Sequence, residues 1–155
     1  MKKVLLVVDV QKGFTRGNNE LVDKINEYLK HEKYDEVIST IFINHKDSNY
    51  IKYINWSRIM ELEEPLIKSD RVIVKYGYGL DDYSVLSKNV HYDIVGISTE
   101  ACVSKIAMDL FDRGYDFSVI ERLCYSTGGL VAHDCGIEVL RRNIGSALIQ
   151  SDESK

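Results

Sequence analysis

Cysteine and proline are scarce in this chain of 155 residues. Its three cysteines, Cys102, Cys124 and Cys135, are odd in number and lack CxxC spacing, so neither a disulfide framework nor a cysteine zinc site is indicated. The single proline, Pro65, lies in a polar stretch, and no repeat or low-complexity tract suggests a linker. We therefore expect a single domain over residues 1–155, located in the reducing cytoplasm.

A basic surface and long hydrophobic runs are also missing. The formal net charge of -4 argues against a partner that is a nucleic acid or an anionic membrane surface. The apolar run Val4–Val8 stops at Asp9, which is too short for a signal peptide or a membrane span. We expect a small-molecule substrate, with no nucleic acid and no membrane as partner.

Short apolar runs alternate with segments of helical period. The runs are nearly continuous Val, Ile and Leu, as in strands that are covered on both faces. The alternation predicts an α/β fold with three layers (α/β/α), a Rossmann-like, mostly parallel six-stranded sheet with helices on both faces. The expected strands are Lys3–Asp9, Glu36–Asn44, Arg71–Lys75, Asp93–Ile97, Phe117–Glu121 and Ala147–Gln150. The expected helices are Asn19–Lys30, Asn55–Glu64, Asp82–Lys88, Ala101–Arg113 and Gly129–Asn143.

Three chemically useful groups follow strands of this predicted sheet. Ligands in such folds bind beyond the carboxyl ends of the strands. Asp9 ends the first strand, Lys75 ends the third, and Cys102 opens the helix after the fourth. A thiol on the first turn of a helix can have a lowered pKa, and a carboxylate and an ammonium nearby can supply its base and its counterion.

Each of these residues also has a structural interpretation when it is taken alone. Cys102 could be a small buried hydrophobe, Asp9 could cap a turn, and Lys75 could be a solvated lysine at the end of a strand. Their arrival at one sheet edge favours the chemical interpretation.

The motifs at these strand ends resemble those of the isochorismatase-like cysteine hydrolase family, which includes nicotinamidases and related amidases. They are Asp9-Val10-Gln11-Lys12-Gly13-Phe14, Lys75, and Gly96-Ile97-Ser98-Thr99-Glu100-Ala101-Cys102-Val103. The resemblance implies that Cys102 is the nucleophile of an amidase or other hydrolase of C–N bonds, that Asp9 is the general acid/base, and that Lys75 stabilises the thiolate. It also implies a cis peptide before Ser98, and an oxyanion hole made by the backbone N–H groups of Ser98 and Cys102.

Metal ligands and the substrate pocket are less well marked. Nicotinamidases carry an Asp-x-His pair and a second histidine after the second strand, whereas this chain has only His45-x-Asp47 there. We therefore expect no metal, no other cofactor, and a substrate other than nicotinamide. Aromatic residues near the predicted cleft are expected to line the substrate pocket. They are Phe14, Tyr50, Tyr53, Trp56, Tyr76 and Tyr78.

Two other functions remain open from the sequence. The chain could be a catalytically inactive member of the same fold that binds a small ligand or regulates a partner. A redox role for Cys102 is a further alternative, although no resolving cysteine lies nearby in the sequence. Family members are commonly dimers or larger assemblies, so we expect a homo-oligomer.

Overall fold

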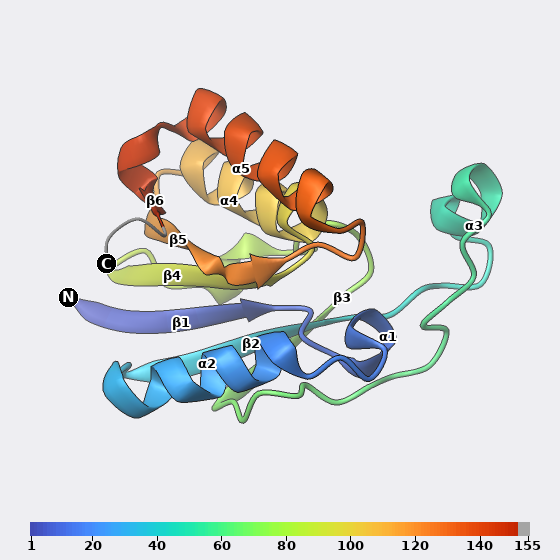
Figure 1. The fold of residues 1–155 in the computed structure, drawn as a ribbon, viewed down its shortest axis with the longest axis horizontal. Helices are drawn as coiled ribbons and strands as arrows, with labels where there is room; N and C mark the ends of the chain where they lie inside the picture. The colour runs from blue at the N-terminus through green and yellow to red at the C-terminus, as the bar shows by residue number, and fades with distance from the viewer. Residues whose placement is uncertain (152–155) are drawn as a thin grey trace.

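The computed structural model describes residues 1–151, which surround one six-stranded sheet (Figure 1). All neighbouring strands are parallel, in the order β3-β2-β1-β4-β5-β6. The strands are β1 (Lys2–Val8), β2 (Glu36–Phe42), β3 (Arg71–Lys75), β4 (Val90–Ile97), β5 (Asp116–Tyr125) and β6 (Ile149–Gln150). The predicted parallel α/β architecture is confirmed.

Helices cover both faces of this sheet. They are α1 (Lys12–Thr15), α2 (Glu20–His31), α3 (Asn49–Ile54), α4 (Ser104–Asp112) and α5 (Leu130–Ile144). Figure 1 shows α4 and α5 on one face and α2 on the other, with α1 and α3 toward the side where the strands end. No helix in the described part of the chain is long and apolar enough to cross a membrane.

The alternation of side chains along β1 builds a core on each face of the sheet. Val4, Leu6 and Val8 belong to the core that includes α4, whereas Leu5 and Val7 belong to the core under α2. All of these side chains are buried. A strand covered on both faces needs apolar residues at consecutive positions, which explains the continuous run in the sequence.

The expected helix over Asn55–Glu64 is wrong. That stretch is irregular, and helix α3 lies just before it. Asn55 ends α3 with φ 50°, and Ile59 has φ 57°, so the backbone turns left-handed twice within the segment. Ser48 caps the start of α3, because its side chain accepts a hydrogen bond from the N–H of Ile51.

Two other expected helices differ in type from the structure. The helix after β4 opens with a π-helical turn at Thr99–Val103 before α4 begins. The segment expected to be helical over Asp82–Lys88 contains only a short 3₁₀ turn at Tyr83–Val85. Cys102 therefore lies in a wide helical turn that precedes the α-helix, a kind of turn that is frequent at functional sites.

Gly96 brings the ends of β1 and β4 together. A Cβ atom at this position would lie 2.2 Å from the carbonyl oxygen of Val8, so only glycine fits. Gly96 also has φ 134°, which L side chains rarely adopt. This close approach places Asp9, the residue after Val8, beside the turn that follows β4.

Candidate active site

The side chains of Asp9, Lys75 and Cys102 meet beyond the ends of β1, β3 and β4. Lys75 Nζ lies 2.8 Å from Asp9 Oδ2 and donates a hydrogen bond to Cys102 Sγ at 3.3 Å. Asp9 and Lys75 are 0% exposed and Cys102 is 7% exposed. The structure thus brings together the three residues that the sequence singled out.

The carboxylate of Asp9 is held from the neighbouring strand. Asp9 leaves β1 with φ 51°, a conformation that aspartate tolerates better than most residues. Thr40 on β2 donates its hydroxyl to Asp9 Oδ1 at 2.6 Å and accepts from the N–H of Asp9 at 3.1 Å. Oδ2 of Asp9 has no hydrogen-bond partner beyond its ion pair with Lys75, in the part of the chain described. That oxygen is available to accept a proton.

Lys75 is a buried cation with several partners. Its Nζ donates to the carbonyl oxygen of Gly77 at 2.6 Å and lies 5.3 Å from the ring centre of Phe42. Burial alone would lower the pKa of Lys75, but the charges of Asp9 and Cys102 outweigh burial and raise it. Lys75 therefore stays protonated at neutral pH.

The thiol of Cys102 has a raised pKa, contrary to the expectation from its helical position. Burial and then the nearby Asp9 carboxylate raise the pKa of Cys102 to about 12, although Lys75 acts in the opposite direction. The helix end does not decide the pKa, because the thiolate would form in a dry site next to a negative charge. The resting residue is a neutral thiol whose proton must be removed during the reaction.

The turn from Ser98 to Cys102 is fixed by contacts with two other segments. The Ile97–Ser98 peptide bond is cis, as the family resemblance predicted. Ser98 Oγ accepts a hydrogen bond from the N–H of Thr127 at 3.1 Å. Gly136 of α5 packs so closely that a Cβ there would lie 2.8 Å from Cα of Glu100. Helix α5 therefore presses directly on the turn that carries Cys102.

A cavity of about 330 Å³ opens beside Cys102. Four of the aromatic residues expected there, Phe14, Tyr50, Trp56 and Tyr78, line it. Phe14 and Trp56 stack with ring centres 6.1 Å apart and an interplanar angle of 6°. The rest of the lining comes from Gly13, Arg16, Phe42, Ile54, Arg58, Ser98, Glu100, Ala101 and Thr127.

Two of the expected pocket residues lie outside this cavity. Tyr53 is 79% exposed on α3, and Tyr76 stacks on His45 with ring centres 4.2 Å apart. Sequence analysis did not single out Phe42, because it reads as part of a strand, or Arg16 and Arg58, because isolated arginines carry no motif. An arginine where a helix normally ends in glycine, at Arg16, was the one signal available.

A second cavity, of about 260 Å³, lies near the start of α5 and contains none of the three central residues. Its lining includes Leu21, Cys124 and His133. His133 Nδ1 lies 2.6 Å from the buried hydroxyl of Thr99, so His133 supports the turn before Cys102 from outside. Cys124 is buried and Cys135 is exposed, and neither forms a disulfide within residues 1–151.

The donors near the central residues do not fit a metal ion. Within residues 1–151, no three His, Cys, Asp or Glu side chains gather in a way that could hold one. His45 stacks on Tyr76, and Asp47 is exposed in the loop after it. We therefore derive no chemical step through a metal.

Comparison with known proteins gives one family match and several similar structures. The model of the isochorismatase domain matches residues 3–153. No curated protein matches the chain. Nicotinamidase from Bacillus subtilis has a TM-score of 0.69 at 16% identity, over 94% of this chain and 97% of that chain. N-carbamoylsarcosine amidase from Thermoplasma acidophilum has a TM-score of 0.71 at 18% identity, over 100% of this chain and 99% of that chain. Pyrazinamidase of Pyrococcus horikoshii, in complex with zinc, has a TM-score of 0.72 at 19% identity, over 97% and 98% of the two chains.

Proposed function

This chain belongs to the isochorismatase domain family, and on that premise we propose that it is a cysteine-dependent hydrolase of a small amide or a related C–N bond. The observation that carries the proposal is the buried position of Lys75 Nζ, 2.8 Å from Asp9 Oδ2 and 3.3 Å from Cys102 Sγ. These groups stand beside a cavity of ligand size. The names of the similar amidases give further support.

In the first half of the proposed reaction, Asp9 Oδ2 takes the proton of the Cys102 thiol as Sγ attacks the carbonyl carbon. The π electrons of the carbonyl move to its oxygen and form a tetrahedral oxyanion. Lys75 holds Asp9 in place and stabilises the negative charge as it moves from the carboxylate through the attacking sulfur to the carbonyl oxygen. Because the resting thiol has a raised pKa, proton transfer accompanies attack and no stored thiolate is required.

The oxyanion is proposed to accept hydrogen bonds from the backbone N–H groups of Ser98 and Cys102. Removing one such donor costs roughly 2.7–4 kcal/mol of transition-state stabilisation in other enzymes. The oxyanion then collapses, the C–N bond breaks, and the leaving nitrogen takes the proton from Asp9. An acyl thioester on Cys102 is left.

Water completes the cycle. Asp9, again ionised, takes a proton from a water molecule as the water oxygen attacks the thioester carbonyl. The C–S bond breaks, and the sulfur recovers the proton from Asp9. The sum is an amide and water converted to a carboxylic acid and an amine, with the protein unchanged.

Release of ammonia from small primary amides, ureides and N-carbamoyl compounds tests the proposal. The wild-type protein is expected to release ammonia from at least one class, and Cys102→Ala is expected to release none. Cys135→Ser is the matched control, because it removes an exposed thiol outside the cavity. Turnover that survives Cys102→Ala would refute the mechanism. Binding without turnover in the wild type would favour the inactive ligand-binding alternative.

A further inference from the structure

We propose that the cavity beside Cys102 selects substrates that carry an anionic group, such as a carboxylate, in addition to the scissile bond; this inference rests on the hydrolase function proposed above. Arg16 and Arg58 both line the cavity. Within residues 1–151, neither guanidinium has a hydrogen-bond or ion-pair partner. Both side chains are exposed, and together they give the wall of one cavity two cationic groups that are free to pair with a ligand of opposite charge.

The backbone of Arg16 is fixed in an unusual conformation. Arg16 follows α1 with φ 51°, and its N–H donates to the carbonyl oxygen of Lys12 at 2.8 Å. Glycine is the usual residue at such a left-handed helix end, because it has no Cβ. The next residue, Gly17, also has a positive φ, of 88°. The chain thus carries a long cationic side chain at a position where helix termination alone favours glycine.

The backbone of Arg58 is held just as firmly. Asn44, which is buried, donates its side-chain amide to the carbonyl oxygen of Arg58 at 3.2 Å. The N–H of Asn44 donates to the carbonyl oxygen of Ile59 at 2.8 Å. The conformation of Ile59, with φ 57°, is rare for a β-branched residue. Both arginines therefore project from ordered backbone next to the cavity.

Ile59 and Gly13 lock the two arginine-bearing segments together. A Cβ at Gly13 would lie 2.4 Å from Cγ1 of Ile59, so the isoleucine fills the space that the missing side chain leaves. Gly13 belongs to α1, which Arg16 follows directly, and Ile59 follows Arg58 directly. This contact keeps the two guanidinium-bearing segments in a constant relation, as recognition of one ligand requires.

The other charges at the cavity do not neutralise the arginines. Asp9 and Lys75 neutralise each other in their ion pair. Glu100 is the one carboxylate among the residues that line the described cavity, against two guanidinium groups, and within residues 1–151 it forms no ion pair with either arginine. A planar guanidinium can bind a carboxylate through two parallel hydrogen bonds, so a ligand carboxylate suits either arginine.

The other lining residues restrict the size and the polarity of the substrate. The stacked pair Phe14 and Trp56, together with Phe42, Tyr50 and Tyr78, gives an aromatic lining. The volume of about 330 Å³ lies at the lower end of the range for ligand pockets. The arrangement fits a small apolar or aromatic acid whose amide group reaches Cys102 while its carboxylate meets the arginines.

Ligand binding to the Cys102→Ala protein tests this inference without turnover. Trp56 is the single tryptophan of the chain and lines the cavity, so its fluorescence reports occupancy. The probes are phenylacetate and its neutral analogue phenylacetamide. We expect phenylacetate to bind about tenfold or more tightly, as charge-assisted hydrogen bonds predict. Raising the salt from about 50 to about 500 mM is expected to weaken phenylacetate alone.

A protein that lacks both cavity arginines is compared with a protein that lacks an arginine elsewhere. Adding Arg16→Gln and Arg58→Gln to the Cys102→Ala protein is expected to bring the two affinities within about twofold, below the gain of one charge-assisted hydrogen bond. Adding Arg142→Gln is expected to preserve the tenfold preference, because Arg142 is exposed on α5 outside the cavity. Circular dichroism verifies folding of each variant. The comparison of binding at low and high salt can be made on the Cys102→Ala protein without an arginine variant.

Equal affinities, no fluorescence change with either probe, or a preference that survives loss of both arginines would overturn the inference. These outcomes are distinct from failure of the hydrolase proposal. A protein that releases no ammonia can still prefer phenylacetate, which would leave the anion site standing alone. A protein that hydrolyses neutral amides as fast as their carboxylate-bearing analogues would keep the hydrolase and lose the anion site.

Discussion

At the scale of single residues, Asp9 has two opposing effects on Cys102. Its carboxylate raises the pKa of the thiol, against the opposite effect of Lys75, and the same carboxylate is the proposed base for the thiol proton. Asp9 thereby keeps the sulfur protonated until a substrate arrives, and then provides the base that removes the proton. The carboxylate that disfavours the free thiolate is thus proposed to be essential for the attack of the sulfur on the substrate.

Replacing Asp9 with Asn separates these two effects. The variant loses the negative charge and keeps Lys75 as a neighbour, so the pKa of Cys102 falls and a larger fraction of the thiol ionises. We expect alkylation of Cys102 by iodoacetamide at pH 7.5 to be about tenfold or more faster, the effect of a one-unit fall in pKa. Ammonia release is expected to be lost.

Mass spectrometry of the Cys102 peptide measures this rate in a Cys135→Ser background, because Cys135 is exposed and would react as well. Lys75→Met is the opposite control and is expected to slow alkylation, since it removes the charge that lowers the pKa. Slower alkylation in Asp9→Asn than in the parent would contradict the assigned effect of the carboxylate.

Gln11 is a second residue whose buried side chain has a specific structural task. Its amide pairs with both backbone groups of Phe42, since Nε2 donates to the carbonyl oxygen at 3.0 Å and Oε1 accepts from the N–H at 2.8 Å. Gln11→Leu leaves these backbone groups buried without partners, at about 1–3 kcal/mol each. We expect the free energy of unfolding in urea to fall by about 2 kcal/mol or more. Lys12→Gln, on the exposed neighbour, is expected to change it by less than about 0.5 kcal/mol.

At the scale of elements, the position of Cys102 depends on how α5 packs. Residue Gly136 lets this helix approach the π-helical turn at Thr99–Val103 until only a hydrogen atom fits between Gly136 and Glu100. His133, one turn earlier on α5, bonds to Thr99 in the same turn. Helix α5 therefore supports the proposed nucleophile although none of its residues lines the cavity.

Gly136→Ala tests this support through the sign of the stability change. In an exposed helix interior, replacing Gly with Ala stabilises by roughly 0.5–1 kcal/mol. Here the new Cβ would lie 2.8 Å from Cα of Glu100, so we expect destabilisation of about 1–3 kcal/mol and lower turnover. Asn143→Ala, exposed on the same helix, is the control and is expected to be neutral or slightly stabilising. A more stable Gly136→Ala protein in thermal unfolding would show that the contact is loose.

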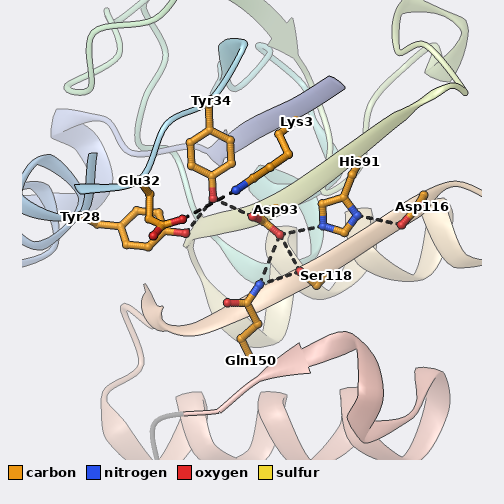
Figure 2. Close-up of polar contacts among 9 residues, drawn as sticks. All are labelled: Lys3, Tyr28, Glu32, Tyr34, His91, Asp93, Asp116, Ser118 and Gln150. Carbon is orange, nitrogen blue, oxygen red and sulfur yellow. Dashed lines mark hydrogen bonds and ion pairs between the residues drawn. The ribbon is translucent and has the colours of Figure 1, made fainter. Parts of the chain in front are cut away.

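At the scale of the whole molecule, a polar network joins the sheet at the end opposite the cavity. Figure 2 shows Asp93 of β4 at its centre, with side chains reaching it from several elements. Asp93 accepts hydrogen bonds from Tyr34 at 2.6 Å and Ser118 at 2.6 Å, and His91 Nε2 lies 2.9 Å from it. The other ring nitrogen of His91 lies 2.7 Å from Asp116, so the ring bridges two carboxylates.

The stability of the protein is expected to depend on pH through His91. Burial lowers the pKa of His91, but hydrogen bonds and charge from Asp116 and Asp93 outweigh burial and raise it. A raised pKa stabilises the folded state below the unfolded value of about 6.5, and this contribution disappears as pH rises through the folded value. Urea unfolding should therefore show a larger deficit for His91→Gln at pH 6 than at pH 9. A deficit that grows with pH would refute the assignment.

The sequence predicted the sheet well because the strands are short apolar runs, and the central ones, β1 and β4, are covered on both faces. It also brought Asp9, Lys75 and Cys102 to one edge, because parallel strands place their carboxyl ends together. The irregular segment after α3 and the two arginines were missed, since both depend on left-handed backbone that is fixed by Asn44 and the Gly13 contact. The pKa of Cys102 could not be predicted either, because burial decides its sign. The expected homo-oligomer stays a prediction.

Residues 43–70, between β2 and β3, supply four of the residues that line the cavity, Tyr50, Ile54, Trp56 and Arg58, and none of the three central residues. Part of the proposed substrate preference is therefore encoded apart from the bond-breaking residues, whereas Phe14 and Arg16 of the same cavity follow Asp9 closely in the chain. Recombination that exchanges this stretch between relatives would change one part of the cavity wall and leave Asp9, Lys75 and Cys102 in place. Its junctions would lie beside Phe42 and Arg71, at strand ends whose backbone pairing any donor sequence must respect.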